Sequence, residues 1–512
     1  MLSNEQQKLI DENIALKALL QKKDSTIRYL EEKLILLQIK KFASQSEKHL
    51  EQAKTQLNLF NEAEELFSLN DDIIQNETND SENKVVIPEH TRNLGRKKLP
   101  ADLPREEVII DLPAEEKICP HDGTLLNKIG QVESESLDII PAKIKIIRTI
   151  RLKYACPCCQ QTIKTAANPV KLLPKTMATP GLLSHIAISK YCDHLPLYRQ
   201  EKILERMGIE INRNTLAEWM IKVGEAIQPL INLLQDQLLE KNYISFDETP
   251  IQVLKEDGKK AQSKSWMWVQ LSYGLKPIVL YHYDPSRSSK APKKLLTGFS
   301  GYLQVDGYTG YDPVFSENKK IIRVGCWAHA RRKFMDAYKV GSNKNVANSF
   351  INLIKELYLI EEKIREMPPD EKLKWRQNKS LIILDKIKDK LDLLFGKTPP
   401  KSKIGEAINY CLNEWDNLKV YLTNGILHID NNLIENVIRP FCLGRKNWLF
   451  SASVDGAESS SNFYSLLHTC YANGLEPYNY LRYIFAKLPE AKTVDDFEKL
   501  LPTNLTPEVV KI

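Results

Sequence analysis

The feature that most constrains the fold is a change in the spacing of apolar residues near residue 242. Three stretches rich in β-branched and aromatic residues, separated by polar turns, predict successive strands over 243–254, 265–273 and 276–284. The pattern then predicts a helix, a fourth strand, and a fifth strand running into a helix, over 290–299, 301–308 and 320–334. Three strands, a helix and two further strands make a mixed α/β core.

The length of 512 residues exceeds what one hydrophobic core organises and predicts three or more structural units. Hydrophobic residues make up 42% and charged residues 27%, as in soluble globular proteins. Residues 176–235 and 333–427 have helical patterns without strand signals. No apolar run approaches the roughly 20 residues that span a bilayer, and the amino terminus is polar, unlike a signal peptide. We therefore expect a cytoplasmic protein without a membrane partner.

A heptad repeat occupies the first forty residues. Two core positions recur every seven residues, one interrupted by Lys23 and the other begun by Asn13: Leu9, Leu16, Leu30 and Leu37, and Leu20, Ile27 and Leu34. This spacing predicts a parallel dimeric coiled coil of roughly 55 Å, at about 1.5 Å per residue. A single amphipathic helix packed on its own domain is the alternative.

Charge is spread unevenly along the chain. Residues 57–83 contain eight acids and no Lys or Arg, so the remainder has 72 basic against 58 acidic residues, a net charge of +14. This excess is compatible with a polyanionic partner. Residues 68–105 are polar with scattered prolines, which predicts a linker that is disordered in its acidic half.

Clustered cysteines predict a metal site, because the chain has no export signal that would favour disulfides. Cys156 and Cys159 form a CxxC knuckle, in which two thiolates can bind one tetrahedral Zn²⁺. Cys119 begins the opposite knuckle, and Asp122 stands at the position three residues later. The fourth ligand stays open among three neighbours: Asp122, His121 and Cys158. We predict a zinc ribbon, and the alternative is a reduced cysteine cluster without metal.

A short helix, a glycine-containing turn and the segment "NRNTLAEWM" resemble a helix-turn-helix. The second helix is expected to begin at Asn214 or Thr215. Contact with DNA and packing inside the protein are both compatible with this pattern.

Three acids are placed where they can meet. Asp247 is expected at the end of the first strand and Asp306 at the end of the fourth, and these strands are neighbours in a ribonuclease-H-like order. Glu435, on a predicted helix against the sheet, supplies a third carboxylate. Such a set suits Mg²⁺, and two ions about 3.5–4 Å apart promote in-line phosphoryl transfer. Alternatively, individual acids are turn or cap residues. Glu248 is expected to point away from Asp247, because side chains alternate along a strand.

Several long motifs, in the same order along roughly residues 90–490, resemble those of the insertion sequence 66 family of transposases, which are bacterial DDE recombinases. They include "GRKKLPADLPREEVIIDLP", "ATPGLLSHIAISKYCDHLPLYRQE", "DETPIQVL", "CWAHARRKF", "NNLIENVIRP" and "GRKNWLFSAS". The resemblance implies a zinc-binding segment, a DNA-binding region and a ribonuclease-H-like catalytic domain interrupted by a helical insertion.

By motif matching, the resemblance implies that the catalytic, Mg²⁺-binding triad is Asp247, Asp306 and Glu435. The cations that follow the third acid would contact DNA phosphates: Arg439, Arg445 and Lys446. The aromatic run 447–450 is expected to be strand-like and to pack behind the helix. Cys326 and His329, in "CWAH", match a family feature, for which we prefer a supporting role behind the acids over metal binding.

The chain departs from the family pattern at two positions. Asp122 stands where a second cysteine is common, which puts the fourth zinc ligand in doubt. Asn436 stands where an arginine commonly follows the catalytic glutamate, so that Arg439, Arg445 and Lys446 remain as the local cations.

The expected organisation follows from these motifs, in chain order: a coiled coil (1–50), a partly disordered linker (51–105), a zinc-finger-like segment (106–170), a helical, helix-turn-helix-like DNA-binding region (171–240), the first part of the catalytic core (241–334), a helical insertion (335–427), the last part of the core (428–490) and a C-terminal tail (491–512).

Three functional hypotheses follow. The first is an active transposase that nicks the ends of its element and transfers a 3′ hydroxyl to target DNA with Mg²⁺, as a homodimer or larger assembly to which accessory proteins of the element could contribute. The second is a catalytically silent DNA-binding relic or a repressor of its own element. A general nuclease is the third, although a coiled coil and DNA-binding modules suit the pairing of two ends better than indiscriminate cutting.

Overall fold

The computed structural model describes residues 144–155, 163–340 and 344–511, together with eight isolated residues between Leu16 and Lys33. The chain divides into two compact units, one of residues 1–70 with 169–512 and the other of residues 71–168. The predicted linker and the four predicted zinc ligands lie outside the described residues, as does the coiled coil apart from those isolated positions. They remain predictions.

The described part of the smaller unit contains an antiparallel hairpin of β1 (Lys153–Ala155) and β2 (Ile163–Thr165). Its base is closed by the N–H of Ala166, which donates to the carbonyl of Leu152 at 3.0 Å. Residues 144–152, which precede β1, have no regular secondary structure. A strand needs a partner for its backbone groups, and among the described residues the ladder with β2 begins only at Lys153.

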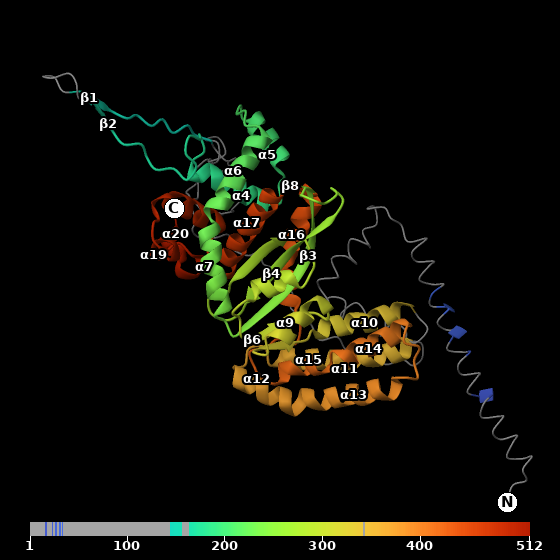
Figure 1. The fold of residues 1–512 in the computed structure, drawn as a ribbon. Helices are drawn as coiled ribbons and strands as arrows, with labels where there is room; N and C mark the ends of the chain where they lie inside the picture. The colour runs from blue at the N-terminus through green and yellow to red at the C-terminus, as the bar shows by residue number, and fades with distance from the viewer. Residues whose placement is uncertain are drawn as a thin grey trace, which may run out of the picture. The chain divides into compact units, whose positions relative to one another are not determined.

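A mixed sheet forms the centre of the larger unit (Figure 1). Its described strands are β3 (Tyr243–Lys255), β4 (Lys264–Ser272), β5 (Val279–Asp284), β6 (Gly301–Gln304), β7 (Ile321–Val324) and β8 (Ser451–Ser453). The order is β5-β4-β3-β6-β7, with β8 paired to β3 beyond this path. The first three strands are antiparallel, and β6 and β7 continue the sheet in parallel with β3. The predicted mixed α/β core is confirmed.

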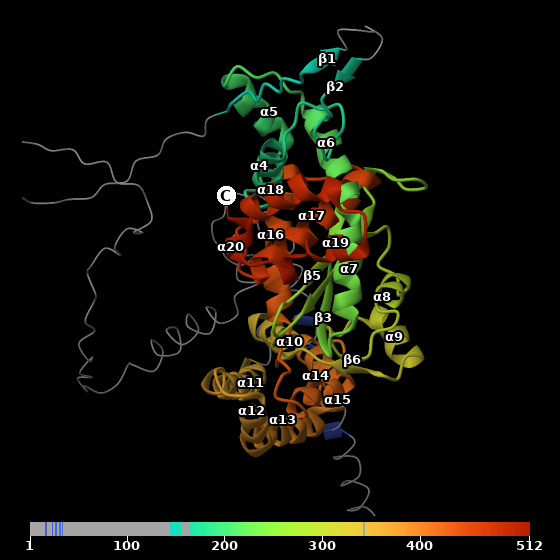
Figure 2. The same cartoon turned by 90° about the vertical axis from the view of Figure 1, so that its left-hand side faces the viewer.

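Helices from both ends of the larger unit pack around this sheet: α4 (Pro180–Tyr191), α5 (Leu197–Arg206), α6 (Arg213–Ala226) and α7 (Gln228–Leu239) before it, and α16 (Asn432–Trp448), α17 (Val454–Ala472) and α18 (Pro477–Lys487) after it. Helices α7, α16 and α17 contact its strands, and α6 packs on α17. Helix α17 runs beside the edge strand β5, as Figures 1 and 2 show. The hydroxyls of Ser465 and Thr469 accept hydrogen bonds from the backbone N–H groups of Tyr281 and Val279, at 2.7 and 3.0 Å. These contacts satisfy backbone donors that an open sheet edge would leave exposed.

Helix α6 is the second helix of the predicted helix-turn-helix. It begins one or two residues earlier than expected. The side chain of Asn212 accepts from the N–H of Asn214 and caps the helix at Arg213. Beyond its first turn one face of α6, with Leu216 and Trp219, is buried in the hydrophobic core that also contains the sheet. Arg213 and Asn214 at its amino-terminal end are exposed, and so are Glu218 and Lys222 on its outer face.

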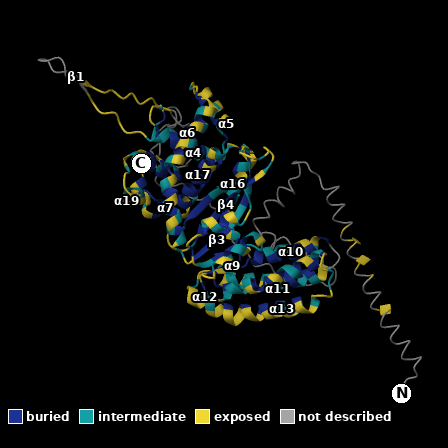
Figure 3. Ribbon diagram, in the orientation of Figure 1, coloured by how far each residue is buried: buried dark blue, intermediate teal, exposed yellow. Residues whose placement is uncertain are grey.

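Between β7 and α16 the chain is helical throughout residues 327–340 and 344–422 apart from short turns. The elements are α10 (Trp327–Val340), α11 (Lys344–Lys363), α12 (Pro369–Trp375), the π-helical turn η4 (Arg376–Ser380), α13 (Leu381–Leu394), α14 (Lys403–Asn413), α15 (Trp415–Lys419) and η5 (Val420–Leu422). They enclose a second hydrophobic core, and the outer face of α13 is exposed (Figure 3).

Arg376 holds these helices together from inside. Its guanidinium is 2% exposed, forms a bidentate pair with Glu361 at 2.8 and 2.6 Å, and donates to the carbonyls of Tyr421, Asn424 and Leu427. This buried charge is therefore neutralised and hydrogen-bonded, which burial of an ion requires.

Short elements complete the larger unit: α8 (Lys290–Leu295), η3 (Thr309–Tyr311), α9 (Asp312–Glu317), η6 (Leu488–Glu490), α19 (Val494–Glu498), η7 (Pro502–Asn504) and α20 (Pro507–Val510). The segment expected as a C-terminal tail is folded, because Leu501 and Val510 are buried in the core of the sheet. Within the described parts of the chain, no helix combines the length and the apolar character needed to cross a bilayer.

Candidate active site

Asp247 and Asp306 are brought together by strand pairing. Ser245 of β3 is the register partner of Gln304 of β6, and each acid follows its strand's member of that pair by two residues. Neighbouring strands lie about 5 Å apart, so the two acids start from adjacent backbone positions. One expectation was wrong: Asp247 does not end its strand. The antiparallel pairing with β4 continues beyond it, and β3 ends only at Lys255.

Glu435 lies in the first turn of α16, and the chain before this helix is tied to the start of α10. The N–H of Trp327 donates to the carbonyl of Ile429 at 3.1 Å, and that of Asn431 donates to the thiol of Cys326 at 3.2 Å. These contacts determine where α16 begins. Glu435 is 6% exposed. Cys326 thus packs behind the turn that presents Glu435.

Burial and neighbouring charges disfavour the ionised forms of Asp247 and Glu435. Burial raises the pKa of Asp247 well above its ordinary value, and the charges of Glu248, Asp306 and Glu435 raise it further. Burial also raises the pKa of Glu435, where Arg332 acts against the rise and Asp306 adds to it. Asp247, Asp306 and Glu435 therefore lie close enough to repel one another inside a partly desolvated site.

This donor set fits a hard divalent cation by its chemistry. One oxygen of Asp247 accepts from the N–H of Glu248 at 2.8 Å, and one of Asp306 accepts from the N–H of Tyr308 at 3.0 Å. A bound cation would relieve the repulsion between the buried carboxylates. As they stand, no three His, Cys, Asp or Glu side chains of the described residues are grouped closely enough to enclose a metal ion. Binding would require the acids to draw together.

Arg332 and His329 of α10 face Glu435. The Nη2 atom of Arg332 lies 3.5 and 3.4 Å from the two carboxylate oxygens, and Nε2 of His329 lies 3.9 Å from Oε1. Burial, together with the charge of Arg332, lowers the pKa of His329 to about 4, so its ring is neutral at neutral pH. Arg332 is thus a charged partner of Glu435, and a cation bound to Glu435 would compete with it.

Sequence reasoning gave Glu248 no role and did not single out Arg287. The side chain of Glu248 contacts Tyr311, the residue against which Phe246 packs, which agrees with the expected alternation along β3. Arg287 pairs with Glu248 at 2.6 Å. The available signal was the pair of adjacent acids in one strand, because a second buried carboxylate beside Asp247 needs a cation of its own.

The cations after Glu435 occupy different environments. Arg445 is directed at β3, where its Nη1 atom donates to Thr249 Oγ1 at 3.0 Å and to the carbonyl of Pro250. Lys446 is exposed and Arg439 is half-buried. Arg445 therefore holds α16 on the sheet. Lys446 is better placed than Arg445 to contact an external phosphate.

The aromatic run 447–450 is not a strand. Helix α16 continues to Trp448, which packs against Phe441 with ring centroids 5.6 Å apart. The chain then turns at Leu449, whose φ is 68°, and pairs with β3 only from Ser451. Backbone pairing with β3 therefore decides where the strand begins.

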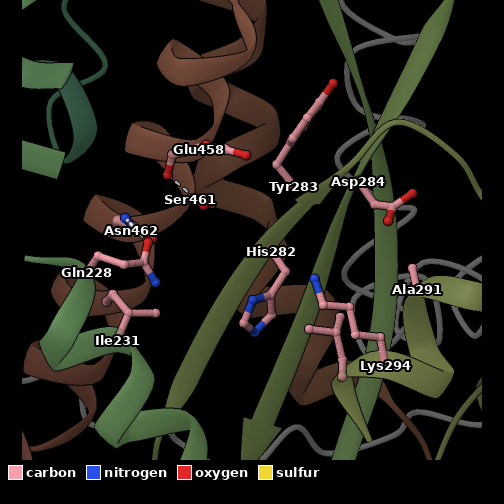
Figure 4. A pocket seen from close by; sticks show the side chains of 11 residues that line it. Gln228, Ile231, His282, Tyr283, Asp284, Ala291, Lys294, Glu458, Ser461 and Asn462 are labelled. Atoms are coloured by element: carbon pink, nitrogen blue, oxygen red, sulfur yellow. Dashed lines mark hydrogen bonds between the residues drawn. The ribbon is translucent and has the colours of Figure 1, made fainter. Parts of the chain in front are cut away.

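A separate cavity of about 260 Å³ lies between α7, α8, β5 and α17 (Figure 4). Lys294, Glu458 and His282 contribute to its lining. Burial and the nearby charge of Lys294 lower the pKa of His282 to about 4, and its Nε2 atom lies 2.9 Å from Oε1 of Gln270. The triad acids are not among the described residues that line this cavity.

Comparison with known families gives consistent matches along the chain. The model described as "Transposase IS66 family" matches residues 175–459, and "IS66 C-terminal element" matches residues 465–503. "Zinc-finger binding domain of transposase IS66" matches residues 116–160, the range that contains the predicted zinc ligands, and "Transposase C of IS166 homeodomain" matches residues 29–108.

Two relatives from Sinorhizobium fredii (strain NBRC 101917 / NGR234) are similar over most of their length. The uncharacterized protein y4qI is 34% identical over 429 residues, which cover 81% of this chain and 78% of the relative. The uncharacterized protein y4jD is 33% identical over 425 residues, which cover 81% and 82%. With family matches from residue 29 to residue 503, the chain belongs to the IS66 family of transposases.

Proposed function

We propose that this protein is an active DNA transposase of the ribonuclease-H-like, DDE type. It would bind the terminal inverted repeats of its element in the cytoplasm, cleave there and join the ends to target DNA. The observation that supports this best is the placement of Asp247 in β3 beside Asp306 just after the adjacent strand β6, with Glu435 within the range of their charges. The strand order β5-β4-β3-β6-β7 also suits a ribonuclease-H-like core.

In this proposal Asp247, Asp306 and Glu435 hold Mg²⁺. When bound, two such ions supply activation of an attacking oxygen and stabilisation of a leaving oxygen during in-line displacement. The protein's part is to position the donors. Cys326 and the backbone of Asn431 place α16, and Glu435 would hold the metal with the carboxylate that contacts Arg332 in its absence.

DNA would be held by surfaces outside the triad. We assign Lys446 and Arg439 to phosphate contacts and Arg445 to the packing of α16 against β3. The exposed start of α6, at Arg213 and Asn214, is a second candidate surface. A zinc segment with Cys119, Asp122, Cys156 and Cys159 as ligands and a coiled-coil dimer would bring two ends together, with accessory proteins where the element requires them.

A cleavage and strand-transfer assay tests the proposal. DNA from either edge of the gene is incubated with the protein and Mg²⁺, with Asp247→Ala run beside the wild type. We expect metal-dependent nicking by the wild type and none by the variant, with DNA binding retained in both. Binding without nicking by the wild type, with the element's accessory proteins also supplied, would favour a silent DNA-binding relic or a repressor.

A further inference from the structure

Beside the triad lies a second polar cluster, which we call the Arg287 clamp: Arg287, Glu248, Tyr308, Tyr311 and Trp266. Glu248 is its centre, with a side chain that is 2% exposed. One of its oxygens accepts from both Nε and Nη2 of Arg287, each at 2.6 Å, and the other accepts from the hydroxyl of Tyr311. Three donors thereby hold the carboxylate of Glu248 in place.

Aromatic rings hold the guanidinium from other directions. The guanidinium carbon of Arg287 lies 4.0 Å from the ring centroid of Tyr308 and 4.8 Å from that of Trp266. The hydroxyl of Tyr308 donates to the backbone carbonyl of Arg287 at 2.8 Å. An arginine fixed by a carboxylate and two rings loses little further freedom when it binds a ligand.

The clamp adjoins the triad on two sides. Glu248 follows Asp247 in β3, and the N–H of Tyr308 donates to the carboxylate of Asp306 at 3.0 Å. Burial opposes the charge on Arg287, but the charges of Glu248, Tyr308 and Asp306 outweigh it and raise its pKa. Arg287 is therefore a permanent cation within the electrostatic reach of Asp306.

One edge of Arg287 remains available. Its side chain is 40% exposed, and its Nη1 atom donates to no described residue. Two rings already lie against the guanidinium, where a nucleobase would otherwise stack. Phosphate oxygens suit the remaining edge, because arginine N–H groups form charge-assisted hydrogen bonds to them.

We propose that Arg287 binds a backbone phosphate of the DNA strand that enters the triad, next to the reacting phosphate, and that Glu248 and Tyr308 orient it for this contact. The proposal rests on the proposed function, since it takes the ligand to be the DNA that is cut. It makes Arg287 a DNA-binding residue and Glu248 a positioning residue.

The test replaces single phosphates by neutral methylphosphonates in duplexes from the edges of the gene, at each position around the cleavage site. Dissociation constants are measured with Ca²⁺ in place of Mg²⁺, to limit cutting. For the wild type we expect one or two positions at which the replacement weakens binding about tenfold. Arg287→Gln should weaken binding of unmodified DNA about tenfold and abolish the penalty at those positions. It should also lower the slope of log K against log salt by about 0.9, the value for one phosphate contact.

Controls separate this contact from a general loss of charge or folding. Arg482→Gln removes an exposed arginine on α18 and should leave the positional penalty intact. Arg287→Lys keeps the charge and should retain the salt slope with a reduced penalty. The proposal would be overturned if a folded Arg287→Gln protein kept the binding penalty at the same positions as the wild type. If the wild type binds with an Arg287-dependent penalty but never cleaves, the contact stands and the proposed catalysis fails.

Discussion

Asp247 in β3 and Asp306 just after the end of β6 occupy equivalent positions, each two residues beyond the aligned pair Ser245 and Gln304 of these parallel neighbouring strands. They lie 59 residues apart in the chain, and the β4–β5 hairpin and α8 fill the interval. The sheet therefore creates a concentration of negative charge that neither local segment contains. The mutual repulsion of these carboxylates destabilises the folded state, and measurable consequences follow from it.

Asp247→Asn should stabilise the protein while abolishing cleavage. The substitution removes a charge that burial and neighbouring acids make unfavourable, so the free energy of unfolding should rise. Thermal unfolding of the wild type should also shift upward with Mg²⁺, and this shift should shrink in the variant. Equal shifts in both proteins would argue against Asp247 as a metal ligand.

Arg332→Gln should tighten Mg²⁺ binding. Arg332 contacts both oxygens of Glu435, so a cation must compete with it for this carboxylate. We expect a several-fold lower apparent Kd, measured by Mg²⁺ titration of intrinsic fluorescence or by calorimetry. Lys333→Gln on the same helix serves as the control for a general change in charge. Weaker binding in Arg332→Gln would show that Arg332 organises the site instead of competing for it.

Arg376→Met should destabilise the helical segment between β7 and α16. It leaves the partly buried Glu361 without its cation and three carbonyls without a donor, which costs about 3–5 kcal/mol. Lys388→Met breaks an exposed pair with Asp392 and should change stability by less than about 0.5 kcal/mol. Urea denaturation followed by circular dichroism measures both. Similar losses in the two variants would contradict the assigned role of Arg376.

Gly224→Ala should loosen the contact between α6 and α17. A Cβ at this position would lie 2.4 Å from Oγ and 2.8 Å from Cα of Ser459, so the helices must separate. We expect a loss of about 1–3 kcal/mol. At Gly181 the nearest atom to an added Cβ is 3.5 Å away, so Gly181→Ala should be neutral or slightly stabilising. Thermal melting of both variants compares them, and an unchanged Tm for Gly224→Ala would refute close packing here.

Stability should fall as the pH is lowered from 6.5 towards 4. Burial lowers the pKa of His468 to about 4 from its ordinary 6.5, so the unfolded chain binds more protons in that interval and is favoured by acid. One such histidine lowers the free energy of unfolding by about 2 kcal/mol when the pH falls from 7 to 5. His468→Gln should therefore show a smaller loss than the wild type over this interval, measured by urea denaturation at each pH. Raised carboxyl pKa values, as at Asp247, act with the opposite sign and are common to both proteins.

Strand and helix types in the larger unit followed from local pattern. The β-branched and aromatic residues of "YISFDETPIQVL" and "SWMWVQLSY", bounded by polar turns, predicted β3 and β4 nearly to the residue, because such side chains suit strands that are buried in a core. The ends of the elements could not be predicted as well. Helix α6 begins at Arg213 because Asn212 caps it, and β8 begins only at Ser451 because its pairing with β3 begins there. Caps and partner strands decide where a segment begins and ends.

By itself, the sequence determined the chain's family, its mixed α/β core and the identity of the three acids expected to meet, because motif order and hydrophobic period are local properties of the chain. The tertiary structure decided what each charge does. Arg445 packs against β3, Arg332 faces Glu435, and Glu248 is bound to Arg287. These partners come from distant segments, and only folding brings them within the few ångströms over which a hydrogen bond or ion pair acts.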